Sequence, residues 1–519
     1  TFVHDASDTT SADNGFDVIV STLGARWKLQ NYNYIYTSQL GAVSSESVSS
    51  QTLALKKLSN ISENTVIVFE DVYTINERID IEDINNLIFC GPGGIKKDST
   101  LNNIDAISFK HCNNITVRDM QLEGVQDAWA NGPLFGDQGV GFFSCQRISI
   151  LNNKFKNFGD AAHRILRTSD EPVGTPTDAT DNIVSGNYYE SIQQTSTTTG
   201  GARRFIFSNN IGFNINGAFK FASRAPDSGL LIISNNVVEN VKDKCFSILA
   251  QDQIAVTGNI AKNILGTFMD YDSTGLQETV TVQKMMLVAN NNVDGCTSFA
   301  RISNDDHIGG FDKVVISANM STGDSTGNII LIRGALDVNN VAIRGNQFDK
   351  FVKGVVLDQA ESVAIDVFDV QSNTFRGLDG SVIDFSLGGG INGNLRISDN
   401  ICTDCEKFGT FSSASPFTHT DISRNNFLSD RPASAWLEAF ANALTVYTGI
   451  YNNIVKINST NVACNLDIND TYLGFNHFEN NGSGAALRLD SGDTGIVDMG
   501  GNSIVGGYTR NGVAVTKGE

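Results

Sequence analysis

Apolar and polar residues alternate over short stretches along most of this chain, and Gly, Asn and Asp separate the stretches. A period of two is typical of half-buried β-strands, and helical periodicity is almost absent. One pattern, apolar-x-apolar-x-x-Asn, recurs many times, for example at Leu395, Ile397 and Asn400. The pattern therefore predicts an all-β protein assembled from repeated short-strand units.

The repeat has a nearly constant length. Its asparagines are Asn153, Asn187, Asn210, Asn236, Asn259, Asn291, Asn319, Asn346, Asn373, Asn400, Asn425, Asn453, Asn476 and Asn502, which makes 13 steps over 349 residues. A unit of about 27 residues cannot bury its apolar face alone and must stack on its neighbours. We therefore expect a right-handed parallel β-helix, one coil per repeat, rising about 4.8 Å per coil. A β-propeller is the competing fold, but its blades take about 40–45 residues.

The composition agrees with this architecture. The chain of 519 residues contains 54 Asn and 49 Gly but only 7 Pro. Asparagine suits the corner of a coil because it tolerates the left-handed backbone conformation and because stacked amides can hydrogen-bond from coil to coil. Proline is disfavoured because each strand has neighbours on both sides and needs its N–H group.

The N-terminal segment differs from the repeats. Strand-like stretches occur at Phe16–Thr22 and Ala25–Leu29, and Glu46–Leu58 carries apolar residues at helical spacing. We expect this short helix to cap the end of the β-helix, as solenoids require. The expected organisation is a cap segment over residues 1–60, the parallel β-helix over 61–505 and a tail over 506–519.

Two repeat steps are longer than the others. One accommodates Arg167–Thr180 and the other Asp272–Thr281. Insertions in a solenoid project as loops from one face, which is often the binding face. These loops are either walls of a binding groove or tolerated surface decoration.

Charge and cysteine content exclude several classes of protein. With 37 Lys+Arg against 57 Asp+Glu, the net charge of −20 argues against nucleic-acid binding, which needs a basic surface. No apolar run of about 18 residues exists, so membrane insertion is not expected, and no signal peptide is visible. The 8 cysteines are scattered, and the lone CxxC at Cys402 and Cys405 has no second ligand pair. We expect buried, reduced thiols, no metal site and no cofactor.

Three stretches carry a resemblance to a known family: Asp5–Gln30, Thr65–Ile75 and Ile84–Gly94. With the helix between the first two, they resemble bacteriophage tailspike proteins that have a pectate-lyase-like right-handed parallel β-helix. The Gly-Asp-Gly…Asp-Asp stretch that often precedes the cap helix in tailspikes is absent, since Gly41–Ser50 reads GAVSSESVSS.

The resemblance implies a homotrimer on the virion tail that acts outside the host cell on a bacterial surface polysaccharide, either capsule or lipopolysaccharide O-chain. It also implies attachment to the virion through an N-terminal region that this sequence lacks. The catalytic carboxylates of the family sit at varied positions, so none can be transferred to a residue here.

Equivalent positions in successive repeats can also be used to predict a functional site. The strand that follows each repeat asparagine carries a central polar or outward-alternating residue, and in-register stacking would align these residues into a stripe. The stripe reads His163, Thr197, Lys220, Ser247, Asp270, Arg301, Arg333, Asp358, Asp384, Thr410 and Trp436. A polar stripe with interspersed Arg and carboxylate side chains suits an extended glycan.

The strongest catalytic pair in the stripe is Asp358 and Asp384, which are 26 residues apart and therefore lie in adjacent coils. Like charges directly across neighbouring strands destabilise a sheet, so their presence asks for a functional reason. One carboxyl as proton donor and one as carboxylate are what glycoside hydrolysis requires. Arg333, one coil earlier, could bind a substrate carboxylate or phosphate. The alternative interpretation is that both aspartates are ordinary surface residues without a catalytic role.

Two further clusters are candidates. Asp270 and Asp272 lie on one strand face, with Arg301 one coil on, and provide a second carboxylate pair with a substrate-binding arginine. A basic cluster combines His163, Arg167 and, two coils further, Lys220. Basic residues suit a polysaccharide lyase, which neutralises a uronate carboxylate and abstracts the adjacent proton.

The leading hypothesis is therefore an endo-acting glycoside hydrolase that depolymerises a polysaccharide with paired carboxylates. A lyase acting by β-elimination on a uronate-containing glycan is the second hypothesis. A non-catalytic adhesin that uses the same groove for recognition is the third.

Overall fold

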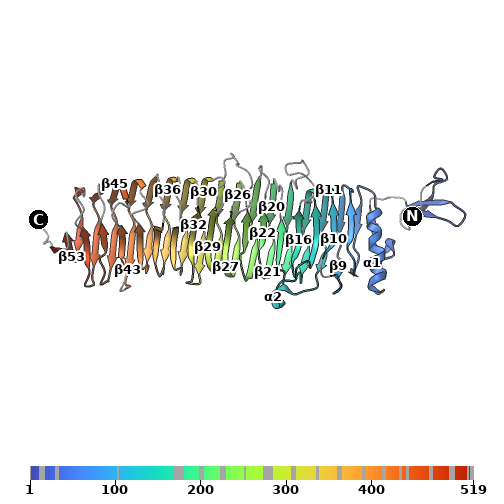
Figure 1. Cartoon of the computed structure of the whole chain (residues 1–519), viewed down its shortest axis with the longest axis horizontal. Helices are drawn as coiled ribbons and strands as arrows, with labels where there is room; N and C mark the ends of the chain where they lie inside the picture. Colours follow the sequence, from blue (N-terminus) through green and yellow to red (C-terminus); the bar gives the residue numbers. More distant parts are fainter. Residues whose placement is uncertain are drawn as a thin grey trace. The chain divides into compact units, whose positions relative to one another are not determined.

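The structure is a computed structural model, and it describes residues 2–10, 18–29, 34–101, 104–166, 181–197, 204–222, 229–249, 253–272, 285–304, 311–334, 338–358, 365–387, 393–411, 417–431, 435–439, 444–466, 471–489, 497–498, 500–510 and 513–514. The chain forms two compact units, residues 1–247 and 248–519. Short parallel strands stacked coil upon coil make up most of each unit (Figure 1). The predicted all-β, parallel β-helical fold is confirmed.

A coil of the second unit shows the plan. It contains β36 (Ile365–Gln371), β37 (Thr374–Arg376) and β38 (Ser381–Leu387). Each strand pairs in parallel with its counterpart in the next coil, namely β39 (Asn394–Ser398), β40 (Ile401–Thr403) and β41 (Lys407–Phe411). We call these the first, second and third strands of a coil, and the sheets that they build the first, second and third sheets.

The remaining strands follow the same plan. First strands are β4 (Tyr34–Tyr36), β5 (Val66–Val68), β8 (Leu87–Cys90), β11 (Asn113–Arg118), β14 (Gln146–Leu151), β17 (Asn182–Ser185), β20 (Arg204–Ser208), β23 (Leu230–Ser234), β26 (Gln253–Thr257), β28 (Met285–Ala289), β30 (Phe311–Ser317), β33 (Val338–Arg344), β42 (Phe417–Ser423), β45 (Leu444–Tyr451), β48 (Thr471–Gly474) and β51 (Val497–Asp498). Second strands are β6 (Val72–Ile75), β9 (Gly94–Lys97), β12 (Gln121–Glu123), β15 (Lys154–Lys156), β18 (Tyr188–Glu190), β21 (Ile211–Ile215), β24 (Val237–Val241), β31 (Met320–Gly323), β34 (Gln347–Asp349), β43 (Asn426–Ser429), β46 (Ile454–Ile457), β49 (His477–Asn480) and β52 (Ser503–Val505). Third strands are β7 (Ile79–Glu82), β10 (Asp105–Lys110), β13 (Gln138–Phe143), β16 (Ala161–Leu166), β19 (Gln194–Thr197), β22 (Phe219–Ala222), β25 (Phe246–Leu249), β32 (Asn328–Gly334), β35 (Lys353–Asp358), β44 (Ala435–Ala439), β47 (Cys464–Leu466), β50 (Ala485–Leu489) and β53 (Gly507–Arg510), to which β54 (Val513–Ala514) pairs antiparallel. In β27 (Ile260–Asp272) and β29 (Asn292–Asn304) the second and third strands are continuous.

The repeat asparagines form a hydrogen-bonded ladder within each unit. The backbone N–H and the Nδ2 of Asn346 both donate to Oδ1 of Asn373, at 3.0 and 2.9 Å, and the same Nδ2 donates to the carbonyl of Ile316 at 2.9 Å. Equivalent bonds join Asn153 through Asn236 in the first unit and Asn259 through Asn502 in the second. The predicted ladder is confirmed, including the copies that deviate from the consensus spacing.

One part of the explanation for asparagine was wrong. The left-handed residue at the corner is the one before the ladder asparagine, for example Asn152, Ser372 and Asp399, with φ of 55°, 55° and 59°. The ladder asparagines are instead selected because a buried amide can both donate and accept at the same corner. The left-handed position accepts several residue types, so it leaves a weaker sequence signal.

The interior is filled by apolar side chains that stack from coil to coil. The rings of Phe155 and Tyr189 stack with centroids 5.2 Å apart, and Phe348 and Phe375 stack at 5.9 Å. All 8 cysteines are buried and free, as expected. Burial raises the pKa of the Cys464 thiol above 9, so this thiol is protonated and packs as a small apolar side chain.

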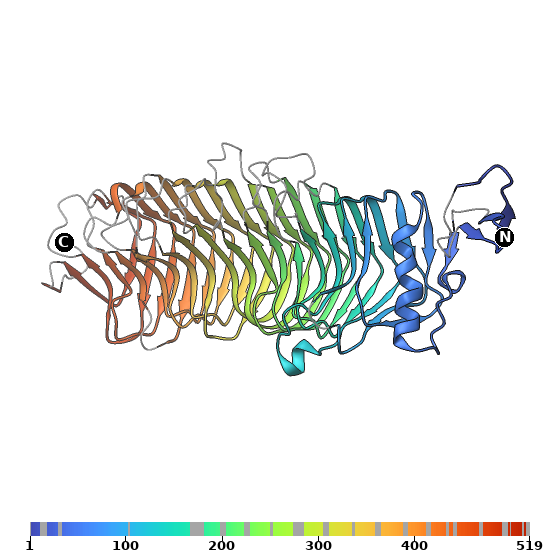
Figure 2. The ribbon, with the colours of Figure 1, turned by 45° about the vertical axis from the view of Figure 1, so that its right-hand side comes forward.

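The helix expected in the cap segment forms α1 (Val48–Lys56), with Ser47 as its N-cap, and a 3₁₀ turn, η2 (Lys57–Asn60), follows it. It lies beside the first coils of unit 1, as Figure 2 shows. Gln51 accepts a hydrogen bond from the backbone N–H of Thr74 at 2.7 Å, so the helix satisfies a strand-edge group. Another 3₁₀ turn of the same length, η1 (Thr37–Leu40), precedes the helix.

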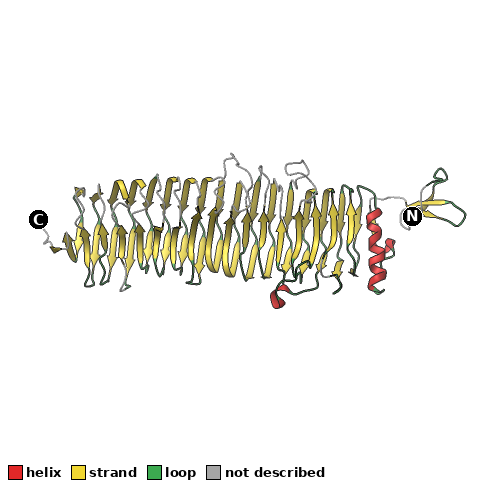
Figure 3. Ribbon diagram, in the orientation of Figure 1, coloured by secondary structure: helices red, strands yellow, loops and turns green. Residues whose placement is uncertain are grey.

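The N-terminus carries a small antiparallel sheet in the order β1 (Phe2–His4), β3 (Arg26–Leu29), β2 (Val18–Val20). Among the described residues, α-helix is otherwise limited to α2 (Ala128–Asn131), as Figure 3 shows. Neither of these described helices has the length and apolar character to cross a membrane.

Candidate functional site

The outer face of the third sheet in unit 2 carries most of the residues proposed from the sequence. Along β38, Ile383 and Phe385 are fully buried in the interior, and Asp384 between them points to the outer face. The strand register aligns two parallel files on this face. One file is Asp270, Arg301, Leu331, Val356, Asp384 and Thr410, and the other is Asp272, Ser303, Arg333 and Asp358.

Asp270 and Arg301 are direct neighbours in the first file. The Arg301 guanidinium donates from Nε and Nη2 to both carboxylate oxygens, with Nη2 and Oδ2 2.9 Å apart. The Asp270 side chain is only 2% exposed. Because this bidentate pair occupies both oxygens, it suits a structural or positioning role better than a catalytic one. Asp272 is half-buried and lies opposite Ser303 in the second file.

The expected face-to-face alignment of Asp358 and Asp384 was wrong. Asp384 lies opposite Val356, because paired residues of β35 and β38 differ by 28 in number there and the two aspartates by only 26, and Asp358 lies opposite Leu387 after a shift of register. The two carboxylates are therefore diagonal neighbours on adjacent coils. Two residues along a strand and one step between strands separate their Cα atoms by about 8 Å.

A lysine that sequence reasoning missed completes this region. Lys353 Nζ lies 2.5 Å from Asp384 Oδ2, and the Asp384 side chain is 5% exposed. Asp358 is half-buried and forms no ion pair with the part of the chain that the structure describes. Arg333 lies directly opposite Asp358, is exposed, and likewise forms no ion pair with described residues. Sequence reading took one residue per strand, so the lysine at the start of β35 was left out.

His163 was expected on the outer face, and this was wrong. It is 1% exposed, it lies opposite the buried Val140, and its Nε2 is 3.0 Å from the hydroxyl of Tyr189 in the interior. Burial lowers the pKa of His163 to about 3, so the imidazole is neutral at physiological pH. Trp436 is also fully buried rather than part of an outer stripe. Connector lengths differ by single residues, and each difference turns a side chain to the other face.

The basic cluster of unit 1 is only partly assembled. Lys220 is half-buried on β22 opposite Ser196, and Ser196 lies opposite Arg164. Arg164 donates to both oxygens of the buried Asp105, at 2.9 and 2.8 Å, so it is already neutralised. Arg167 lies outside the described residues, as do the proposed loops over 167–180 and 273–281.

A second polar region lies on the first sheet of unit 2, where sequence reasoning proposed nothing. A cavity of about 210 Å³ is lined by Val367, Asp369, Asn394, Leu395, Arg396, His419, Thr420, Asp421 and Tyr451. Asp369, Arg396 and Asp421 are consecutive in register. Each lies four residues before a ladder asparagine, so reading that repeat position would have found them.

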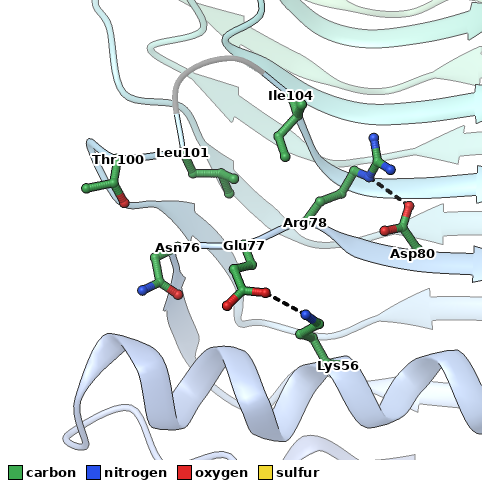
Figure 4. A pocket seen from close by; sticks show the side chains of 8 residues that line it. All are labelled: Lys56, Asn76, Glu77, Arg78, Asp80, Thr100, Leu101 and Ile104. Atoms are coloured by element: carbon green, nitrogen blue, oxygen red, sulfur yellow. Dashed lines mark hydrogen bonds and ion pairs between the residues drawn. The ribbon is translucent and has the colours of Figure 1, made fainter.

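A larger cavity, of about 460 Å³, lies beside α1 in unit 1 (Figure 4). Its charged lining is paired internally: Lys56 with Glu77 at 2.5 Å and Arg78 with Asp80 at 2.7 Å. Figure 4 shows these pairs on the wall between the helix and the first coils. Both of its carboxylates, Glu77 and Asp80, are thus engaged in ion pairs.

One group among the described residues has ligand atoms close enough to share a metal ion. It consists of Glu82, Asp83 and His111, with His111 Nδ1 3.9 and 3.6 Å from the two carboxylates. All three side chains are exposed, which is common for acidic surface groups without an ion. Geometry alone does not make this group a metal centre.

Comparison with known proteins gives one match to a family model. Residues 1–32 match the phage tail protein small four-stranded β-sheet domain, the segment that contains β1, β2 and β3. No curated protein matches the chain. The resemblance stated above is thus confirmed in its two parts, a phage tail segment and a parallel β-helix after it.

Several solved structures are similar in fold. A tailspike of Escherichia coli bacteriophage HK620, in complex with a pentasaccharide, is 11% identical and covers 77% of this chain and 76% of its own, with a TM-score of 0.49. The endo-xylogalacturonan hydrolase of Aspergillus tubingensis is 15% identical over 80% and 98% of the two chains, with a TM-score of 0.34. The enzymatically active domain of bacteriophage CBA120 tailspike protein 2 is 10% identical over 87% of this chain, with a TM-score of 0.28, and the match spans 52% of that domain. At these identities the likeness concerns the fold.

Proposed function

We propose that this chain is the glycan-binding and glycan-cleaving part of a phage tailspike, and that it hydrolyses a bacterial surface polysaccharide through Asp358 and Asp384. The observation that carries the proposal is the diagonal carboxylate pair on the outer face of the third sheet, with Lys353 on one carboxylate and Arg333 opposite the other. The match of residues 1–32 to a phage tail domain supports the virion tail as the location.

The neighbours of the two carboxylates support a different role for each. Asp384 is paired with the Lys353 ammonium, which suits a carboxylate that acts as general base on a water molecule. Asp358 has no cation within ion-pairing distance among the described residues, which suits the general acid that protonates the leaving oxygen. If the carboxyl groups keep the separation of about 8 Å between their Cα atoms, they leave room for the water that an inverting hydrolase requires.

Arg333 and Arg301 then serve substrate binding in different ways. The exposed Arg333 guanidinium presents several N–H donors and can bind a carboxylate or phosphate of the glycan. Arg301 is held by Asp270 and can present only its remaining donors. Lys220, in unit 1, contributes a further positive charge to the outer face of the third sheet there.

The decisive experiment is incubation of the protein with purified capsule and O-chain polysaccharides, followed by size-exclusion chromatography and a reducing-end assay. Shortened chains with new reducing ends and no unsaturated uronate would support a hydrolase. Unsaturated uronate, detected by its ultraviolet absorbance, would make the protein a lyase. Binding without any shortening of the bound glycan would make it an adhesin and overturn the catalytic proposal.

Assembly is a separate part of the proposal. We expect a homotrimer, and attachment to the virion through a region preceding the segment of residues 1–32. Light scattering coupled to size-exclusion chromatography measures the subunit number directly, and a monomeric mass would contradict the trimer.

A further inference from the structure

The cavity on the first sheet of unit 2 is built from three consecutive coils. Asp369 on β36, Arg396 on β39 and Asp421 on β42 lie in register, and the next residue in that file is Gly449. Because glycine has no side chain, no side chain of this file covers Asp421 on the side of Gly449. Tyr451 lies beside it and donates its hydroxyl to Asp421 Oδ2 at 2.8 Å.

The charges at this cavity balance. Asp369 forms an ion pair with Arg344, and Arg396 Nη1 lies 3.8 Å from Asp369 Oδ1. Both guanidinium groups thus lie at Asp369, and with Asp421 the four side chains carry no net charge. A site with no net charge disfavours a free cation or anion and suits an uncharged polar ligand.

Two buried carboxylate oxygens of the lining have no hydrogen-bond partner among the described residues: Asp369 Oδ1 and Asp421 Oδ1. The Asp369 residue is 4% exposed. A buried carboxylate oxygen without a donor costs free energy, and a hydroxyl-bearing ligand supplies the missing donor. The unpartnered atoms therefore point to a ligand rich in hydroxyl groups.

The apolar lining residues and the volume of the cavity further limit the kind of ligand that fits. Val367 and the ring of Tyr451 provide apolar surface next to the polar atoms. A volume of about 210 Å³ lies below the range of about 300–1,000 Å³ typical of drug-sized ligands. One pyranose ring, with apolar C–H faces and hydroxyl edges, matches both features.

We propose that this cavity binds one uncharged hexose or N-acetylhexosamine unit and forms a saccharide site separate from the carboxylate pair on the third sheet. Asp421 and Asp369 accept hydrogen bonds from the sugar hydroxyls, and Arg396 and Asn394 donate to its ring or acetyl oxygens. The inference rests on the proposed function in that the sugar is a unit of the same surface polysaccharide. It would hold the glycan on the protein between cleavage events.

The test uses the methyl glycosides of glucose, galactose, mannose and N-acetylglucosamine as probes, with binding to the full chain measured by saturation-transfer NMR titration. We expect at least one probe to bind in the millimolar range, and Asp421→Ala to weaken it about tenfold or more. Asp366→Ala is the matched control, because Asp366 is exposed on β36 and does not line the cavity. Asp384→Asn should bind the probe as the unmodified protein does.

Should Asp421→Ala fail to fold, as judged by circular dichroism, Val367→Trp provides a second variant that fills the cavity and must also abolish probe binding. The inference is overturned if no probe binds the unmodified protein, or if binding survives in the folded cavity variants. Failure of the proposed function looks different: probe binding and its loss in Asp421→Ala would persist while no polysaccharide is shortened.

Discussion

Asp384 lies opposite Val356 rather than opposite Asp358 in the parallel pairing of β35 and β38. This register turns a pair of like charges that would repel across one strand gap into a diagonal pair about 8 Å apart. Lys353 reaches Asp384 from the start of β35, at 2.5 Å. In the proposed function, the relationship between the two aspartates sets the geometry of the catalytic pair.

Replacement of either carboxylate should abolish cleavage without affecting the fold. We expect Asp384→Asn and Asp358→Asn each to lower kcat on the cleaved polysaccharide by about 10²- to 10⁴-fold, the contribution typical of a general acid or base. The reducing-end assay measures the rate, and thermal unfolding checks the fold. Asp366→Asn, at an exposed position on the first sheet, is the control. A variant of Asp384 with full activity would refute this site.

The diagonal geometry also predicts the stereochemical outcome. Carboxylates about 5–5.5 Å apart favour retention, whereas a separation of about 6.5–9.5 Å favours inversion. If the carboxyl groups keep the separation of about 8 Å between their Cα atoms, we expect the first product detected by proton NMR to carry the anomeric configuration opposite to that of the substrate bond. Retention would mean that the side chains approach each other more closely than the register suggests, or that another pair is catalytic.

His163 should make stability depend on pH. Its pKa is lowered from 6.5 to about 3 by burial, so below about pH 6.5 the unfolded chain binds a proton that the folded chain does not. The free energy of unfolding should therefore fall as pH drops from about 6.5 towards 3, by up to about 1.4 kcal/mol per pH unit from this residue.

The variant His163→Phe isolates this effect. Urea unfolding between neutral pH and pH 4 should show the free energy of unfolding falling more steeply with decreasing pH in the unmodified protein than in the variant, because only the unmodified protein loses this contribution. Identical slopes in the two proteins would show that the His163 imidazole does not stay neutral in the folded state.

The ladder should be sensitive to single substitutions. Asn373→Ala removes the Oδ1 that accepts from both the backbone N–H and the Nδ2 of the buried Asn346. Leaving these donors unsatisfied should lower the free energy of unfolding by about 3 kcal/mol or more. Asn339→Ala, where the side chain is exposed and bonds to Asp312, should change it by less than about 0.5 kcal/mol. If denaturant titrations gave the same change in the free energy of unfolding for Asn373→Ala and Asn339→Ala, the ladder would not be stabilising.

The sequence was informative about the fold because the relevant signals are local and periodic. Alternating apolar residues, the ladder asparagines and the helical stretch before Val66 are each read from the chain without knowledge of its neighbours. The left-handed corner residue escaped because Asn152, Ser372 and Asp399 share a backbone conformation and not a residue type. The cavity on the first sheet escaped because only the strand after each asparagine was searched for charged residues.

The sequence by itself determined the period, the coil and the ladder of this protein, because a repeat of about 27 residues and its buried amides leave few other ways to stack. Tertiary structure decided which charged residues meet. A slip of one residue turns a side chain to the opposite face, and a slip of two moves it by about 6.6 Å along its own face. Single-residue differences in the connectors therefore placed His163 in the interior, and the strand register aligned Asp270 with Arg301 and set Asp384 diagonally from Asp358.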